Sequence, residues 1–222
     1  MTFGDFATAV LVVCAIVVTG LAVRREFFRP TAMHLVPSLG VEERWESFAT
    51  SGHIYGVADA PVTIVEFGDY ECPACRVFHG FIDSLLSLGT SVRVVYRHFP
   101  LKIHRFAIPA ALASDCAADQ GSFERMHQAL YEHTDSLGLV PWWWYARTAG
   151  VGDSLKFELC LRSAAAGRSL AVDTVDGQKL GVVATPTILV GPTRVNGVPP
   201  FDSLKAYVER AAKNRSLSGA QK

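Results

Sequence analysis

Residues 62–81, VTIVEFGDYECPACRVFHGF, decide the fold of this chain. The stretch begins with an apolar, β-branched run, VTIVEF, which is typical of a buried strand. After a short turn, Cys72-Pro73-Ala74-Cys75 opens a segment with the apolar spacing of an amphipathic helix. The pattern therefore predicts a strand, a turn and a helix, with two cysteines in the first turn of the helix.

The two cysteines of this motif are expected to differ in chemistry. The first turn of a helix carries unpaired backbone N–H groups and the positive end of the helix dipole, which stabilise a thiolate on the outer, solvent-facing cysteine, Cys72. Cys75 is expected to lie beneath it, shielded and with a higher pKa, as the resolving thiol. Because Pro73 and Ala74 offer no side-chain donor or charge, the helix end and the backbone N–H groups are the main stabilising groups. A stabilised thiolate is a good leaving group and makes the disulfide oxidising.

A C-x-x-C motif alone also fits a structural disulfide or half of a zinc site. The sequence has no second C-x-x-C, while His79, His98 and His104 stay open as further zinc ligands. The strand before the motif and a Thr-Pro far downstream favour a redox pair. We expect no bound metal and no cofactor.

FGDYECPAC, followed downstream by ATPTILV at residues 184–190, resembles the DsbA-like branch of the thioredoxin fold, a family of extracytoplasmic thiol:disulfide oxidoreductases. The resemblance covers roughly residues 45–213 and includes YRHFPL at residues 96–101. It implies an α/β fold with a central mixed sheet, in the order βαβ, inserted helical subdomain, ββα. It also implies a protein thiol:disulfide oxidoreductase, acting as a dithiol oxidase on reduced or unfolded extracytoplasmic proteins and reoxidised by a quinone-linked membrane oxidase.

The resemblance assigns roles to three more residues. In the family, an acid at the position of Glu66 shuttles protons to the inner cysteine; the alternative is that Glu66 points to solvent. Pro186 stands where the fold has a cis-proline facing the disulfide, which leaves the backbone of Thr185 free to pair with a substrate strand. Threonine at 185 departs from the most oxidising members, which tend to have valine, and resembles isomerases and reductases. A reductase or isomerase therefore remains an alternative, as does a non-catalytic chaperone or metal-binding module.

Cys116 and Cys160 fall in the helical part of the chain. Unpaired, they would be small buried hydrophobic side chains. Related DsbA-like proteins sometimes carry a second disulfide between helices of the insert, and such a link would contribute roughly 3–4 kcal/mol in the chain-entropy model.

The remaining periodicity predicts the other elements of the domain. Strands are expected within residues 45–55, at 92–96 parallel to the first core strand, and at 187–190 and 193–198 as an antiparallel pair. Residues 104–168 read as helical, with Gly121 ending a helix that begins at Ala107. Helices at 169–179 and 201–213 complete the domain, and residues 214–222 are expected to be a flexible tail.

Residues 6–23 carry no charge and are long enough to span a bilayer. A cleaved signal peptide would have a basic start, whereas only Asp5 precedes the run; a buried globular helix would show a polar face. We therefore predict an uncleaved anchor over residues 1–24 and a linker over 25–44. Arg24, Arg25 and Arg29 favour a cytoplasmic domain, but the cysteine chemistry favours an extracytoplasmic one, which we expect.

Composition limits the other classes of function. The chain has 222 residues, 50% of them hydrophobic, and a formal net charge of +0. This is enough for one core of ordinary size with an inserted subdomain. The charge balance shows no basic excess that would indicate nucleic-acid binding.

Overall fold

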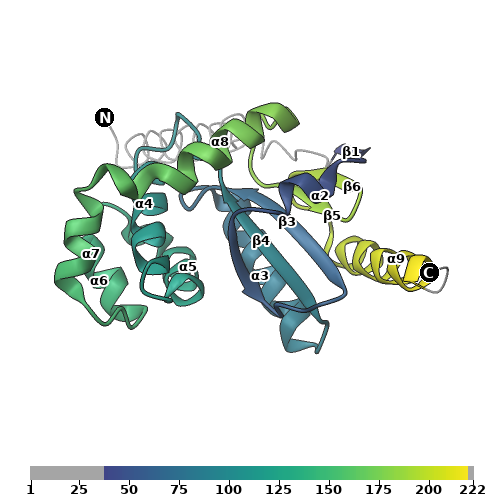
Figure 1. Cartoon of the computed structure of the whole chain (residues 1–222), viewed down its shortest axis with the longest axis horizontal. Coiled ribbons are helices and arrows are strands. Elements are labelled where there is room, and N and C mark those ends of the chain that lie inside the picture. Colours follow the sequence, from purple (N-terminus) through teal and green to yellow (C-terminus); the bar gives the residue numbers. More distant parts are fainter. Residues whose placement is uncertain (1–37, 220–222) are drawn as a thin grey trace, which may run out of the picture. The chain divides into compact units, whose positions relative to one another are not determined.

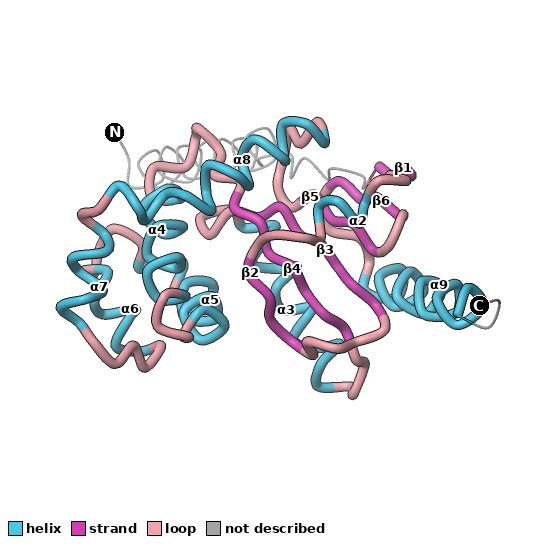
Figure 2. Tube along the Cα trace, viewed as in Figure 1, coloured by secondary structure: helices cyan, strands magenta, loops and turns pink. Residues whose placement is uncertain are grey.

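The computed structural model describes residues 38–219 and shows a mixed sheet with helices on both faces (Figure 1). Within these residues the sheet has six strands in the order β1-β6-β5-β3-β4-β2. Their bounds are β1 Ser38–Val41, β2 His53–Gly56, β3 Val62–Gly68, β4 Val92–His98, β5 Thr187–Val190 and β6 Thr193–Asn196. Figure 2 shows β3 and β4 running through the middle of this sheet.

The centre of the domain is the strand–helix–strand unit expected from the sequence. β3 leads into α3 (Pro73–Ser87), which returns to β4, and the two strands pair in parallel from Val62 opposite Val92. Every residue of β3 is buried, because both faces of the sheet are covered. The parallel pairing of these two strands is thus confirmed.

Alternation along β3 divides its side chains between two cores. Val62 and Ile64 face the larger core, which includes residues of α3 and of the C-terminal helix α9 (Phe201–Gly219). Val65 and Phe67 face a smaller core on the other side, which includes Phe48. Glu66, between them in the sequence, therefore points to the α3 face, toward the cysteine pair.

The last third of the domain has the expected ββα order. β5 pairs antiparallel with β6 and also with β3. Two boundaries differ from expectation: β1 pairs with β6 inside the stretch expected to be a linker, and α9 runs on to Gly219. The first difference arises because all four side chains of β1 are exposed. The sequence therefore shows no alternation of buried and exposed residues that would predict a strand there.

The helical insert lies to one side of the sheet (Figure 1). It is followed by α8 (Arg168–Leu180), which leads back to β5. The glycine expected to end its first helix, Gly121, has φ +68°, a left-handed conformation that favours glycine. The insert comprises α4 Ala107–Ala118, α5 Phe123–Glu132, α6 Trp142–Thr148, α7 Ser154–Leu161 and the 3₁₀ turns η1 Thr134–Ser136 and η2 Ala164–Gly167.

Two predictions for the N-terminal part of the chain have different outcomes. Residues 45–55 contain a short helix, α2 (Trp45–Phe48), before the expected strand, which is β2. The anchor expected at residues 6–23 lies outside the described residues. From residue 38 to residue 219, none of the helices is long and apolar enough to cross a membrane.

Candidate active site

Cys72 and Cys75 lie at the start of α3, both as free thiols. Cys72 is the N-cap residue, Pro73 opens the helix and Cys75 is fully buried. Cys72 is only 6% exposed, so it is more covered than the sequence suggested. The reason is tertiary: the loop at Thr185 lies beside it, and the Cys72 thiol donates to the Thr185 carbonyl oxygen at 3.3 Å.

The surroundings separate the pKa values of the two thiols. A hydrogen bond from the Cys75 thiol is the main cause that lowers the pKa of Cys72 to about 6. Burial opposes this shift, while the Thr185 hydroxyl and the backbone N–H groups of Cys75 and Ala74 add to it. Burial, together with the hydrogen bond to Cys72, raises the pKa of Cys75 well above its usual value. The outer thiol therefore ionises far more readily than the inner thiol, which burial keeps protonated.

Glu66 lies fully buried, and neither of its carboxylate oxygens has a hydrogen-bond partner. The alternative that it points to solvent is wrong. Burial raises its pKa well above the usual value, and the negative charge of Cys72 raises it further. A Cβ atom at Gly68 would lie 3.0 Å from Glu66 Oε1 and 2.9 Å from the Tyr96 hydroxyl, so this glycine leaves space beside the carboxylate. A neutral carboxyl group in this position is able to hold and release a proton.

The peptide bond between Thr185 and Pro186 is cis. The carbonyl oxygen of Pro186 accepts from the backbone N–H of Gly197 at 2.7 Å, which ties this loop to the end of β6. The Thr185 hydroxyl is buried and has no hydrogen-bond partner while Cys72 is a thiol. It is therefore free to donate to the sulfur once Cys72 ionises.

The loop before Cys72 is braced by two acidic side chains that the sequence did not single out. Asp69 Oδ2 accepts from the backbone N–H of Leu101 at 2.8 Å and lies 2.7 Å from His104 Nδ1. Glu71 Oε2 accepts from the backbone N–H of Phe106 at 2.5 Å. These contacts fix the entry into α3, and with it the position of Cys72. Their partners lie 32 to 35 positions further along the chain, so no local pattern indicated them.

Below the cysteines lies a buried cluster of tyrosines and histidines that the sequence did not reveal either. The hydroxyls of Tyr96 and Tyr131 are 3.0 Å apart, and the Tyr70 hydroxyl lies 3.0 Å from His127 Nδ1. The ring of His79 stacks on that of Tyr131 at 4.9 Å. The only early signal was the polar His79 on the inner face of an amphipathic helix, one turn after Cys75.

The second cysteine pair is bonded. Cys116 in α4 and Cys160 in α7 form a disulfide, with Cα atoms 5.7 Å apart. It links two helices of the insert. A zinc ion held by Cys72 and Cys75 would find no third protein ligand among the described residues. The one candidate metal-binding group in that part of the chain contains neither cysteine.

Comparison with known proteins agrees with this architecture. A family model described as thioredoxin matches residues 49–210. The chain belongs to the thioredoxin family. Disulfide bond formation protein D of Bacillus subtilis is 29% identical over 180 residues, which cover 73% of this chain and 78% of that protein. A thioredoxin-like oxidoreductase from Silicibacter pomeroyi has a similar structure, with a TM-score of 0.65, 28% identity, and coverage of 76% of this chain and 97% of that one.

Stretches similar to this chain also occur in longer proteins. The Na(+)/H(+) antiporter NhaA 1 of Salinispora arenicola is 37% identical over 161 residues, which cover 72% of this chain and 24% of the antiporter. The chain thus spans about a quarter of the length of the first curated relatives that it matches. The resemblance to DsbA-like proteins is confirmed, since the thioredoxin family model, a disulfide bond formation protein and a thioredoxin-like oxidoreductase all match this chain, which also carries a pair of free cysteines.

Proposed function

We propose that this protein is a thiol:disulfide oxidoreductase that exchanges a Cys72–Cys75 disulfide with thiols of substrate proteins, mainly as a dithiol oxidase. One observation carries the proposal. The sulfur of Cys72, with its pKa lowered to about 6, lies beside the cis-proline loop, directly above a buried Cys75 whose pKa is raised. A low pKa on the outer thiol stabilises the reduced form and so makes the disulfide oxidising.

The reaction runs in two exchanges. A substrate thiolate attacks the sulfur of Cys72, the Cys72–Cys75 bond breaks, and Cys75 leaves with a proton supplied by the carboxyl group of Glu66. A second substrate thiolate then attacks the substrate sulfur of the mixed disulfide, and Cys72 leaves as a thiolate. The substrate dithiol is oxidised to a disulfide and the cysteine pair is reduced by two electrons. The backbone of Thr185 holds the substrate segment as an added strand.

The decisive experiment is the reduction potential of the Cys72–Cys75 pair in the full chain, equilibrated against glutathione buffers. The state of the pair is measured by mass spectrometry of the alkylated peptide, which separates it from the Cys116–Cys160 disulfide. A potential near about −120 mV supports disulfide donation, and one near about −270 mV reverses the electron flow. A pKa of about 6 lies between those of thioredoxin and DsbA, about 7 and 3.5, so we expect an intermediate potential on the oxidising side.

Threonine at position 185 favours a second candidate, a reductase or isomerase of the same fold. The same potential separates the two candidates. The third candidate is a non-catalytic chaperone or metal-binding module. It would be supported if the purified protein showed no thiol:disulfide exchange activity.

We also propose the domain organisation and location. Residues 1–24 anchor the protein in the membrane, and a linker joins them to the folded domain expected over residues 45–213. The folded part includes β1 and all of α9 and so extends beyond both domain limits. The domain lies on the extracytoplasmic side, where a quinone-linked membrane oxidase reoxidises it. The Cys116–Cys160 disulfide supports an oxidising compartment. The proposal includes no sodium/proton exchange.

A membrane-impermeant thiol reagent applied to intact cells tests the location. Reduced Cys72 should be labelled before lysis. Labelling only after lysis would place the domain in the cytoplasm.

A further inference from the structure

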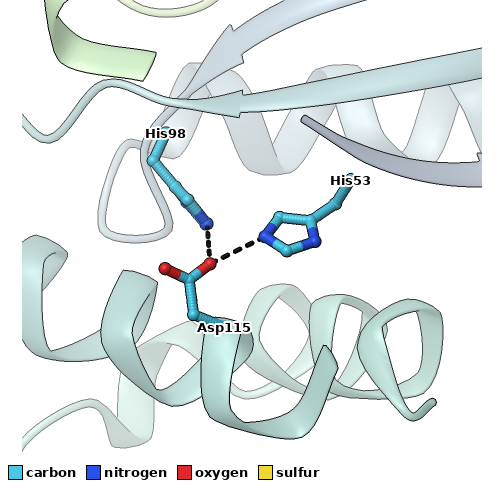
Figure 3. Close-up of side chains that lie close together, drawn as sticks. All are labelled: His53, His98 and Asp115. Carbon is cyan, nitrogen blue, oxygen red and sulfur yellow. Dashed lines mark hydrogen bonds and ion pairs between the residues drawn. The ribbon is translucent and has the colours of Figure 1, made fainter. Parts of the chain in front are cut away.

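Two histidines and an aspartate from three separate elements converge at one point (Figure 3). His53 starts β2, His98 ends β4 and Asp115 lies in α4. The Nε2 atoms of His53 and His98 lie 2.7 Å and 3.0 Å from the same oxygen, Asp115 Oδ1. All the candidate ligand atoms lie within 4.8 Å of one another. The group is distinct from the cysteine pair, which contributes no atom to it.

The neighbours of this triad hold its ligand atoms in place. The ring of His53 stacks on Phe123, with centroids 4.2 Å apart and planes at 13°. The hydroxyl of Ser169 donates to Asp115 Oδ2, which leaves Oδ1 directed toward the two imidazoles. Outer hydrogen bonds of this kind orient the ligands of metal sites.

The triad is enclosed on most sides. The side chains of His53, His98 and Asp115 are 17%, 1% and 10% exposed. The partial exposure of His53 leaves a route from solvent. A fourth ligand is at hand, because the hydroxyl oxygen of Ser114 lies 3.4 Å from His98 Nε2.

We propose that His53, His98 and Asp115 form a binding site for a divalent transition metal of the zinc class, with the Ser114 hydroxyl or solvent as the fourth ligand. Imidazole nitrogens and a carboxylate oxygen are the ligand set that such ions take. Neighbouring ligand atoms of a tetrahedral ion, each about 2.1 Å from it, are about 3.4 Å apart, so metal binding would move the two imidazole nitrogens, now 2.7 Å and 3.0 Å from Asp115 Oδ1, outward by roughly 0.4–0.7 Å.

The two imidazoles converge on one carboxylate oxygen, because His53 Nε2 and His98 Nε2 both hydrogen-bond to Asp115 Oδ1. Without metal, each imidazole donates a proton from Nε2 to this carboxylate. Metal binding requires each ring to carry its proton on Nδ1 instead, and the ion replaces the two hydrogen bonds.

The bound ion joins the sheet to the helical insert. His53 and His98 belong to paired strands and Asp115 to the first helix of the insert. A ligand that binds only the folded state stabilises it by mass action. The proposed metal site therefore has a structural role. Metal binding there does not depend on whether the cysteine pair catalyses exchange.

The test uses the untagged full chain, freed of metal with a chelator and held with Cys72–Cys75 oxidised, so that no free thiolate of the pair competes for the ion. Titration with Zn²⁺ in a calorimeter should show one ion per chain. His53→Gln and Asp115→Asn should each weaken binding at least tenfold, whereas His133→Gln, outside the site, should leave it unchanged. The thermal midpoint should rise with added zinc in the wild type and in His133→Gln only.

Two results would overturn the proposal. One is an oxidised wild-type protein that binds no zinc at micromolar concentrations. The other is unchanged binding in both folded variants, which would place the ion elsewhere. Circular dichroism checks the fold of the variants. Should either variant unfold, the visible absorption spectrum of the wild type with Co²⁺ still tests the proposal. Tetrahedral histidine and oxygen ligands give a strong visible band, whereas hexahydrated cobalt gives only a weak one, so a weak band would overturn the proposal.

Discussion

The thiol of Cys72 donates a hydrogen bond to the carbonyl oxygen of Thr185 at 3.3 Å, across 113 positions of the chain. The contact joins the start of α3 to the cis-proline loop and brings the nucleophilic sulfur next to the backbone expected to receive a substrate strand. The hydroxyl of the same threonine is buried and has no hydrogen-bond partner. Thr185 therefore accepts from the Cys72 thiol through its carbonyl oxygen, and its hydroxyl stabilises the thiolate.

Alkylation of reduced Cys72 should follow the ionisation of its thiol. We expect the rate of reaction with iodoacetamide to have a midpoint near pH 6 and to fall below it, because the pKa of Cys72 is lowered to about 6. A depressed pKa contributes stability above the unfolded value, about 8.5, which is lost as the pH falls through about 6. The reduced protein should therefore gain stability relative to the oxidised protein between about pH 6 and 8.5. A midpoint above pH 8 would contradict this.

Replacement of Thr185 by valine should raise the pKa of Cys72. The substitution keeps the side-chain volume and removes a hydroxyl that stabilises the thiolate. A hydrogen bond to a charged group is worth about 1.5–3 kcal/mol, so the pKa should rise by about one to two units. The pair should then become less oxidising, which is the opposite of what the valine of the most oxidising family members implies. Thr148→Val, in α6, is the matched control, because its hydroxyl bonds only to the backbone of its own helix. The ultraviolet absorbance of the thiolate, followed against pH, measures both variants.

Replacement of Glu66 by glutamine should remove the proton donor to Cys75. Exchange should slow several-fold at neutral pH, and the dependence of its rate on pH should flatten, because glutamine does not titrate. The raised pKa of Glu66 also affects stability. Such a group stabilises the fold fully below its unfolded pKa and less as the pH rises through the folded value. Glu66→Gln should therefore lose less stability than the wild type as the pH rises above the unfolded value of about 4.3. Urea unfolding at several pH values checks this, and parallel curves would refute it.

Replacement of both Cys116 and Cys160 by serine should lower stability without altering the redox pair. The two residues are 44 positions apart, and opening a loop of that size costs about 3–4 kcal/mol in the chain-entropy model. Urea unfolding should show this loss, while the potential of Cys72–Cys75 stays within error of the wild type. A changed potential would instead show that the insert acts on the active site.

The sequence by itself determined the parts that depend on local patterns. The apolar run of β3 and the cysteines at the start of α3 follow from side-chain periodicity, and they agree with the structure. The cis-proline at Pro186 was implied by the family resemblance, and the peptide bond is indeed cis. The helices of the insert were also predicted from the sequence, since glycine and proline signals such as Gly121 mark their ends.

Only the tertiary structure decided which distant groups meet. The contact of Cys72 with Thr185, the partnerless burial of Glu66 and the convergence of His53 and His98 on Asp115 join segments far apart in the sequence. Periodicity tells which face of an element is buried but not which element covers it. Strand β1 escaped detection for a related reason, because it is held by backbone pairing at a sheet edge, where every one of its side chains is exposed.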